Sequence, residues 1–359
     1  LGLIDRVAWF LAFETSTFAH AGLMLALCAA ILRALLPSAS GLRPEARGTL
    51  SLLTIVSIAG YVLSFCLCAW WCSIVHRAAM GAIFSPLGID YAKALVLLGC
   101  IGFTAFMYVV ATGDNFEFLN LSSLHTFYRA RLVRSYLGAA NPARFEADEP
   151  LGSSGPVPLV QPKIMTKRTV FDPHPDDDLA MTEYAPQSFG GPVHLINVCV
   201  NQTRDPRGGL FNQDRQGQPL VIAPGGLMRL GLEPWKALAQ PGALSLGSWV
   251  AISGAAVAPG LGARTRGGIA ALVGFAGMRL GYWWTQAART GKKNTKRKFA
   301  AKSRGLLAEM SGDFAGAAEG ADWFLSDGGH FENTAAYALL AEQSALIVLA
   351  DCGADPGYA

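Results

Sequence analysis

A carboxylate followed by two glycines lies near the C-terminus, in the sequence WFLSDGGHFEN, at Asp327, Gly328 and Gly329. The apolar residues before Asp327 predict a strand, so the carboxylate would lie at the end of a buried element. An aspartate in that position can orient and deprotonate a serine hydroxyl without a histidine. Glycines beside it let a substrate or the backbone approach closely. These residues are therefore a candidate catalytic base and binding loop, and a turn capped by an aspartate is the alternative interpretation.

Two apolar runs separated by a helix-like stretch position this candidate base. The first run ends at Asp327, and the second, ALIVLAD, ends at Asp351. In an open α/β sheet, ligands bind at the edge where the strands have their carboxyl ends. The sequence therefore predicts that Asp327 lies at such an edge, with a further strand that ends at Asp351.

A serine for Asp327 to activate is not evident in the sequence. The 359 residues contain no G-x-S-x-G, the pentapeptide that places a nucleophilic serine on a strand-to-helix turn. The nearest sequences are ALSLG around Ser245 and AISGA around Ser253, of which the second follows an apolar run as an elbow serine would. A G-G-G loop for an oxyanion hole is also missing, and APGGL at Gly225 and Gly226 is the nearest match.

Other polar residues favour structural roles. His330 and Glu332 form H-x-E without an accompanying C-x-x-C, so we expect His330 to support Asp327 rather than to bind zinc. The acidic loop over residues 171–180 could hold calcium, but it lacks the EF-hand spacing and is expected to be a solvated loop. The sequence predicts no metal site and no cofactor.

The apolar residues are concentrated in the first third of the chain. Hydrophobic residues make up 52% of the sequence and charged residues 15%, with a mean hydropathy of +0.32, which is apolar for a soluble enzyme. A helix of about 20 apolar residues crosses a bilayer, and the uncharged stretches that qualify are residues 15–32, 48–75 and 94–113. We therefore expect a transmembrane helical region over residues 1–115 and an α/β domain over residues 116–359.

Basic residues suggest how the chain meets the membrane. Arginines flank the first connection and follow the third span, so the positive-inside rule places the C-terminal part in the cytoplasm. Residues 289–304 carry eight basic residues and no acidic one. A solvated loop and a contact with anionic lipid head groups are both open interpretations. Binding to nucleic acid is not indicated, because Phe299 is the only aromatic residue among these basic residues.

Four further segments have a predictable local structure. Residues 124–138 have apolar side chains at helical spacing and predict an amphipathic helix close to the membrane surface. Residues 139–192 are rich in Pro, Gly, Ser and Asp and predict an extended loop. Residues 193–201 predict a buried strand, and residues 267–284 predict a buried helix packed tightly on a sheet.

Five segments in this order resemble a known family: LHTFYRARLVRSYLG, AISGAAVAPGLG, MRLGYWW, LSDGGHFEN and LIVLADCGADP. They are similar to the membrane-attached bacterial branch of the patatin-like phospholipases, over residues 120–359. The resemblance implies a three-layer α/β/α sandwich that hydrolyses a lipid acyl ester with a serine–aspartate dyad. Asp327 matches the dyad aspartate, and Gly328 and Gly329 complete its motif. The family's serine and oxyanion segments have no match in this chain.

The resemblance implies that this chain supplies the Asp-Gly-Gly half of the dyad. In the family the serine segment precedes the membrane spans, so an N-terminal segment or a partner subunit is expected to carry the nucleophile, and this chain alone is expected to be inactive. An odd number of spans and two abrupt ends fit a fragment or one subunit of a split protein. Membrane lipids are the expected substrates, in the bacterial inner membrane.

A function of another class stays open. The chain would then be a non-catalytic membrane subunit that uses a degenerate patatin-like scaffold for protein–protein interaction in a larger membrane complex, since a fold survives the loss of its site. A transporter is less favoured, because the expected spans contain no charged residue of the kind that transport sites use.

Overall fold

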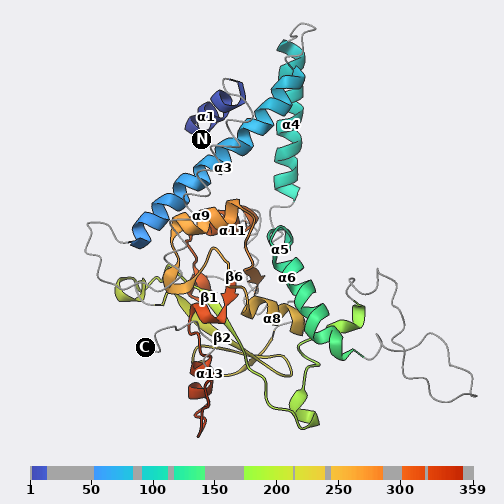
Figure 1. The fold of residues 1–359 in the computed structure, drawn as a ribbon, viewed down its shortest axis with the longest axis vertical. Coiled ribbons are helices and arrows are strands. Elements are labelled where there is room, and N and C mark those ends of the chain that lie inside the picture. The colour runs from blue at the N-terminus through green and yellow to red at the C-terminus, as the bar shows by residue number, and fades with distance from the viewer. Residues whose placement is uncertain are drawn as a thin grey trace, which may run out of the picture.

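The computed structural model describes residues 2–13, 52–83, 91–111, 117–141, 174–212, 215–238, 244–285, 301–319 and 322–350. These residues form a mixed α/β protein, in which short helices lie against a curled antiparallel sheet and two long helices project from one side (Figure 1). The mixed α/β class expected from the sequence is therefore confirmed.

The sheet has six strands in the order β4-β3-β2-β1-β6-β5, and every neighbouring pair is antiparallel. Its strands are β1 (Ile196–Asn201), β2 (Gly217–Ala223), β3 (Leu227–Leu230), β4 (Lys236–Ala237), β5 (Tyr282–Thr285) and β6 (Asp322–Asp327). β1 is uncharged and almost wholly buried, as residues 193–201 predict. β6 lies between β1 and β5, with Asp327 opposite Val198 of β1.

Two expectations about the strands around Asp327 are wrong. The expected open sheet would bring the carboxyl ends of neighbouring strands to one edge, but β6 runs antiparallel to both of its neighbours. The sequence also predicts a strand that ends at Asp351, yet residues 345–350 form no strand, and Leu346 and Val348 are 81% and 83% exposed. Because β1 and β5 occupy both sides of β6, no place beside it is left for this segment.

Most helices are short, whereas α3 and α4 are long. In chain order they are α1 (Gly2–Phe13), α3 (Leu52–Ile83), α4 (Tyr91–Ala111), α5 (Glu117–Leu121), α6 (His125–Leu132), α8 (Leu246–Ser253), α9 (Gly267–Phe275), α11 (Ala301–Ser311), α12 (Gly316–Glu319) and α13 (Ala336–Ala341). A π-helical turn, Val133–Leu137, continues α6. The helix predicted over residues 124–138 is therefore confirmed, while its closeness to a membrane stays a prediction.

The two faces of the sheet bury different side chains, because neighbouring residues of a strand point to opposite faces. Trp323 of β6 enters the larger core, which also contains Trp249 of α8. Phe324, the next residue, packs on the other face with Trp283 and Phe314 and with residues of α5 and α11. β6 is therefore fixed from both sides, and it can hold Asp327 in one place.

The prediction of one helix over residues 267–284 is correct only for its first half. α9 ends at Phe275, and the residues after Gly281 form β5 beside β6. Trp283 and Trp284 belong to the cores on opposite faces of the sheet, which is the alternation of a strand and not of a helix.

α3 crosses α9 at glycines. A Cβ atom on Gly268 would lie 1.8 Å from the carbonyl oxygen of Ser57, and a Cβ atom on Gly60 would lie 2.4 Å from the carbonyl oxygen of Gly268. Two helices approach this closely only where the side chains are absent. The contact holds the long helix α3 against the α/β part of the chain (Figure 1).

The second and third expected spans, residues 48–75 and 94–113, correspond to the helices α3 and α4. Within α3, Ser57–His76 is long and apolar enough to cross a membrane, with a mean hydropathy of 1.9, and 28% of it is buried. The apolar part of α4, Gly99–Ala111, is shorter. Residues 15–32 lie outside the described residues. The helices are as expected, and their passage through a membrane stays a prediction.

The expected loop over residues 139–192 is described only at 139–141 and 174–192. These residues include 3-10 turns at Pro175–Asp177 and Pro186–Phe189 and an isolated bridge from Ala180 to Ser245. The part of this loop that the structure describes contains no α-helix and no longer strand, in agreement with its composition.

Candidate active site

Asp327 ends β6 and caps the 3-10 turn that follows it. One carboxylate oxygen, Oδ1, accepts a hydrogen bond of 2.7 Å from the N–H of Gly329. A Cβ atom on Gly328 would lie 2.5 Å from the carbonyl oxygen of Asn197, so a side chain at this position would push the turn away from β1. Gly328 is thus needed for the turn that fixes the carboxylate.

A cavity of about 470 Å³ lies beside this carboxylate. Asp327, Gly328 and Gly329 contribute to its wall, and the other polar side chains that line it are Tyr128, His194, Asn197, Ser253, Glu332 and Asn333. Among the described residues, none donates a hydrogen bond to the second carboxylate oxygen of Asp327. That oxygen can therefore accept a proton donor that enters the cavity.

Ser253 is brought to the same cavity as Asp327, whereas Ser245 is not. The hydroxyl of Ser253 donates a hydrogen bond of 2.7 Å to the carbonyl oxygen of Asn197. Ser253 is also the last residue of α8, where the helix dipole is negative and disfavours an alkoxide. Ser245 caps the start of that helix by accepting from the N–H of Ser248. Neither serine has the surroundings of an elbow nucleophile.

The candidate oxyanion glycines, Gly225 and Gly226, do not meet Asp327. They lie between β2 and β3 and do not line its cavity. Gly328 and Gly329 do line the cavity, and the N–H of Gly329 is engaged by the carboxylate of Asp327. That N–H is therefore not available to an oxyanion beside Asp327.

His330 connects the turn after Asp327 to the loop after α8. Its Nδ1 lies 2.8 Å from the hydroxyl of Ser326, and its Nε2 lies 3.2 Å from the carbonyl oxygen of Ala256. A carbonyl oxygen only accepts, so Nε2 carries the proton and Nδ1 accepts from Ser326. Burial lowers the pKa of His330 against the opposing effect of the nearby Asp327 charge, so the ring is neutral at pH 7. His330 therefore supports Asp327 through its hydrogen bonds with Ser326 and with the backbone carbonyl of Ala256.

Asn201 completes this network from β1. Its amide donates to the hydroxyl of Ser326 at 2.8 Å, and its oxygen accepts from the N–H of Gly262 at 3.0 Å. The side chain is fully buried. Nothing in the local sequence distinguishes Asn201 from other asparagines, and only the pairing of β1 with β6 shows that it holds two segments of the site together.

Cys199 is the buried nucleophilic side chain nearest to this network. It lies opposite Ser326 in the pairing of β1 with β6. Burial, together with the nearby charge of Asp327, raises the pKa of Cys199 to about 12. The thiol is therefore protonated at neutral pH and does not act as a nucleophile, which requires the thiolate.

The remaining acidic candidates have structural partners. Burial would raise the pKa of Glu332, but hydrogen bonds from Thr334 and from backbone N–H groups at the start of α13 lower it overall. In the loop expected to be solvated, Asp177 is buried and accepts from Asn141 at 3.0 Å. Asp178 pairs with Arg129 at 2.7 Å. Within the described ranges, no group of His, Cys, Asp and Glu side chains is arranged to hold a metal ion.

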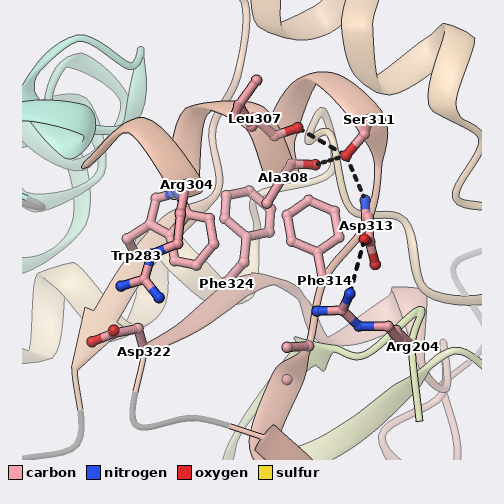
Figure 2. A pocket seen from close by; sticks show the side chains of 13 residues that line it. Arg204, Trp283, Arg304, Leu307, Ala308, Ser311, Asp313, Phe314, Asp322 and Phe324 are labelled. Atoms are coloured by element: carbon pink, nitrogen blue, oxygen red, sulfur yellow. Dashed lines mark hydrogen bonds and ion pairs between the residues drawn. The ribbon is translucent and has the colours of Figure 1, made fainter. Parts of the chain in front are cut away.

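A second cavity, of about 370 Å³, lies on the other face of the sheet beside α11 (Figure 2). Its floor is formed by Trp283, Phe314 and Phe324, which are 9%, 1% and 1% exposed and belong to the core. Arg204, at the rim, pairs with Asp313 at 3.4 Å. This cavity shares no lining residue with the cavity at Asp327, and its rings are too covered to offer a binding surface.

Only the end of the basic run, residues 301–304, is described, and it forms the start of α11. The rest of the run lies outside the described residues, so a solvated loop and a contact with lipid head groups both stay open interpretations.

Comparisons with known proteins identify no relative: no protein-family model, no curated protein and no solved structure matches this chain. The chemistry of the site therefore rests on the geometry of Asp327 and its cavity.

Proposed function

We propose that this chain supplies the aspartate base of a membrane-tethered lipid acyl hydrolase. The observation that carries the proposal is how the Asp327 carboxylate is held at the end of β6. One of its oxygens is fixed by the N–H of Gly329 at 2.7 Å, and the carboxylate borders a cavity of about 470 Å³. A serine–aspartate dyad requires a fixed carboxylate with one oxygen left to receive the hydroxyl proton.

The nucleophile in this proposal is a serine on another polypeptide segment. Ser253 already donates its hydroxyl to Asn197 and lies at the negative end of α8. In this proposal, the serine and its oxyanion donors would reach Asp327 through the cavity of about 470 Å³ that the carboxylate borders. Without that segment the chain has a base but no nucleophile, and we expect it to be inactive alone.

The proposed reaction uses Asp327 twice. In the first step Asp327 takes the proton of the serine hydroxyl while the serine oxygen attacks the acyl carbonyl of the lipid ester, and the alcohol leaves with that proton. In the second step Asp327 takes a proton from water, which attacks the acyl-serine. Asp327 then returns this proton to the serine oxygen as the acyl–serine bond breaks, so that the fatty acid is released and the serine and the carboxylate are restored. No metal ion or cofactor takes part in either step.

The patatin-like architecture is part of the same proposal. Segments that carry the resemblance meet around β6, which supports it. The loop after α8 is bound to the turn after Asp327 through His330 and Asn201, MRLGYWW contributes β5, and Tyr128 of LHTFYRAR borders the cavity. In this interpretation the antiparallel sheet is one part of the three-layer sandwich, and the remaining strands belong to the segment with the serine.

Two features support a membrane tether. α3 contains a stretch that is long and apolar enough to cross a bilayer, and it is packed on α9 through Gly60 and Gly268. The chain after α4 is also fixed, because the side chain of Asn120 bonds both backbone groups of Trp283, at 2.9 and 2.8 Å. A site tethered in this way meets its lipid substrate by proximity. The proposed location is the bacterial inner membrane, with the α/β domain in the cytoplasm.

The second candidate function is a non-catalytic scaffold in a membrane complex. The observation that favours it is the exposure of the apolar segment over residues 345–350, with Leu346 and Val348 81% and 83% exposed. Apolar side chains exposed side by side mark protein–protein contacts. A scaffold would keep this contact and would not depend on the carboxylate of Asp327.

Lipid hydrolysis by the native membrane preparation separates the two functions. The measurement is the release of fatty acid from phospholipid vesicles by membranes that contain the wild-type chain or Asp327→Asn. A hydrolase loses a factor of about 10²–10⁴ in rate in this variant, because its base is gone. Asp313→Asn, an isosteric change at the second cavity, is the matched control and should leave the rate unchanged. Equal rates for wild type and Asp327→Asn would favour the scaffold.

A further inference from the structure

The segment Ala345–Ala350 has an apolar sequence that is typical of a buried strand, but most of its side chains are exposed. Its residues, Ala-Leu-Ile-Val-Leu-Ala, include no polar or charged side chain. Leu346, Val348 and Leu349 are 81%, 83% and 53% exposed. Removal of apolar side chains from water is favourable, so a partner that covers these side chains would gain the free energy of their burial.

The backbone of this segment also lacks partners. The bond from the N–H of Ser344 to the carbonyl oxygen of Leu339 at 3.1 Å ends the turn after α13. From Ala345 to Ala350, no backbone hydrogen bond to another described residue is formed. A row of unpaired N–H and C=O groups on an apolar chain is the template to which another strand adds.

The distribution of exposed side chains indicates what kind of sheet the segment fits. In a strand, Leu346 and Val348 would point to one face, and Ile347 and Leu349 to the other. Both faces are therefore apolar, which is the pattern of a central strand in a sheet covered by helices on both sides.

We propose that Ala345–Ala350 adds as a strand, covered on both faces, to the open parallel-sheet edge of a second polypeptide segment, the one that carries the serine nucleophile. The identity of that segment rests on the proposed hydrolase function, whereas the strand addition rests on exposure, backbone and sequence pattern. An elbow serine follows a strand of a parallel sheet, so a segment that carries one also offers such an edge.

Two other occupants fit the segment less well. A second copy of this chain could pair Ala345–Ala350 with itself, but a two-stranded ribbon would leave both apolar faces exposed. A lipid bilayer would cover the side chains, but it has no groups to satisfy the backbone N–H and C=O groups. α13 also lies at the end of the fold away from α3 and α4, the helices expected in the membrane (Figure 1).

Cysteine reporters on opposite faces of the segment test the strand addition. Leu346→Cys and Ile347→Cys are labelled with a maleimide in native membranes, in the isolated chain in detergent, and in the isolated chain in phosphatidylethanolamine–phosphatidylglycerol vesicles. We expect both reporters to react at least about tenfold more slowly in native membranes than in the other two preparations, because strand pairing suppresses local opening. Leu232→Cys, 75% exposed in a turn after β3, is the matched control and should react equally in all three.

Three outcomes would overturn the proposal. Equal labelling rates in native membranes and in detergent would show that nothing covers the segment. Protection of only one of the two reporters would show a one-sided contact and not a central strand. Protection in the vesicles of the isolated chain would show that lipid covers the segment.

A photo-crosslinking residue at Val348 identifies the occupant in the native membrane. The crosslinked peptide should belong to the polypeptide segment whose serine reacts with a fluorophosphonate, and Ile347→Pro should abolish the crosslink, because it removes a backbone donor without touching the folded core. A crosslink to a second copy of Ala345–Ala350, or to a polypeptide without a reactive serine, would overturn the proposal. If a serine reacts with the fluorophosphonate but both cysteine reporters are labelled freely, the strand addition is rejected and the proposed hydrolase function is retained. Protected reporters without any reactive serine would reject the hydrolase.

Discussion

Ser253 and Asp327 line one cavity, but the hydroxyl of Ser253 donates to the carbonyl oxygen of Asn197 at 2.7 Å. The proton that a base would remove is thus shared with β1. Because Ser253 also ends α8, its oxygen faces the negative end of a helix dipole. Ser253, the serine that lines the cavity of the candidate base among the described residues, is therefore held in a structural hydrogen bond.

We therefore expect Ser253→Ala to keep the rate of lipid hydrolysis in native membranes. Loss of a nucleophilic serine lowers kcat by roughly a millionfold, so the two outcomes are easily separated. The measurement is fatty acid release by the variant and by the wild type at equal amounts of chain. A loss of activity without a loss of stability would show that Ser253 is the nucleophile after all.

The buried amide of Asn201 gives a prediction about stability. Asn201→Ala would leave the hydroxyl of Ser326 and the N–H of Gly262 without this partner inside the fold. Each buried group left unsatisfied costs about 1–3 kcal/mol, so we expect a loss of about 2–4 kcal/mol in the free energy of unfolding. Urea denaturation in detergent measures it. Asn333→Ala, at an exposed position, is the control, and a similar loss in both variants would contradict the network.

The crossing of α3 and α9 predicts opposite effects for two glycines of one helix. Gly268→Ala would place a Cβ atom 1.8 Å from the carbonyl oxygen of Ser57, so the helices must separate, at a cost of about 1–3 kcal/mol. At Gly274 the nearest atom, on the Met310 side chain, would lie at 4.0 Å. Gly274→Ala should therefore stabilise the chain by up to about 1 kcal/mol, because alanine favours a helix.

Hydrogen exchange of the α9 amides compares the two variants. Faster exchange in Gly268→Ala and unchanged or slower exchange in Gly274→Ala would agree with close packing of α3 on α9. The same exchange rates in both variants would show that α3 does not rest on this helix in solution.

His125 gives a prediction about pH. Burial lowers its pKa from 6.5 to about 4, with Arg129 acting in the same direction, and its ring lies 4.9 Å from that of Tyr282. Between pH 6.5 and 4 the unfolded chain binds a proton that the folded chain does not, so stability falls as the pH falls through this window. The loss over the whole window is about 3 kcal/mol.

His125→Phe keeps a ring against Tyr282 and removes this titration. We expect the free energy of unfolding of the variant to change less than that of the wild type between pH 6.5 and 4, by up to about 3 kcal/mol. Urea denaturation at several pH values measures the difference. Parallel pH profiles of the two proteins would show that His125 does not control acid stability.

Local sequence patterns predicted several elements around the site. The uncharged, β-branched run that includes Val198 and Val200 is β1, and the residues from His125 to Gly138 are helical. The apolar residues before Asp327 form β6, and Gly328 and Gly329 make the turn after it. These features follow from neighbouring residues alone, so a local pattern is enough to predict them.

The remaining features depend on contacts between distant residues. The apolar run Ala345–Ala350 has the pattern of a strand, but a strand forms only beside an open edge, and β1 and β5 already flank β6. The role of Asn201 appears only once β1 lies beside β6. For the same reason, the local pattern of residues 267–284 predicts one helix, although the pairing of Trp283 with Phe324 makes their second half a strand.

The most direct test of the central claim is labelling of the native membrane preparation with a fluorophosphonate, followed by mass spectrometry of the modified serine. Asp327 as the base of a dyad predicts a labelled serine on a polypeptide segment bound to this chain. Its rate of labelling should fall by a factor of about 10²–10⁴ in Asp327→Asn and stay unchanged in Ser253→Ala. An unchanged rate of labelling in Asp327→Asn, or labelling of Ser253 itself, would contradict the claim.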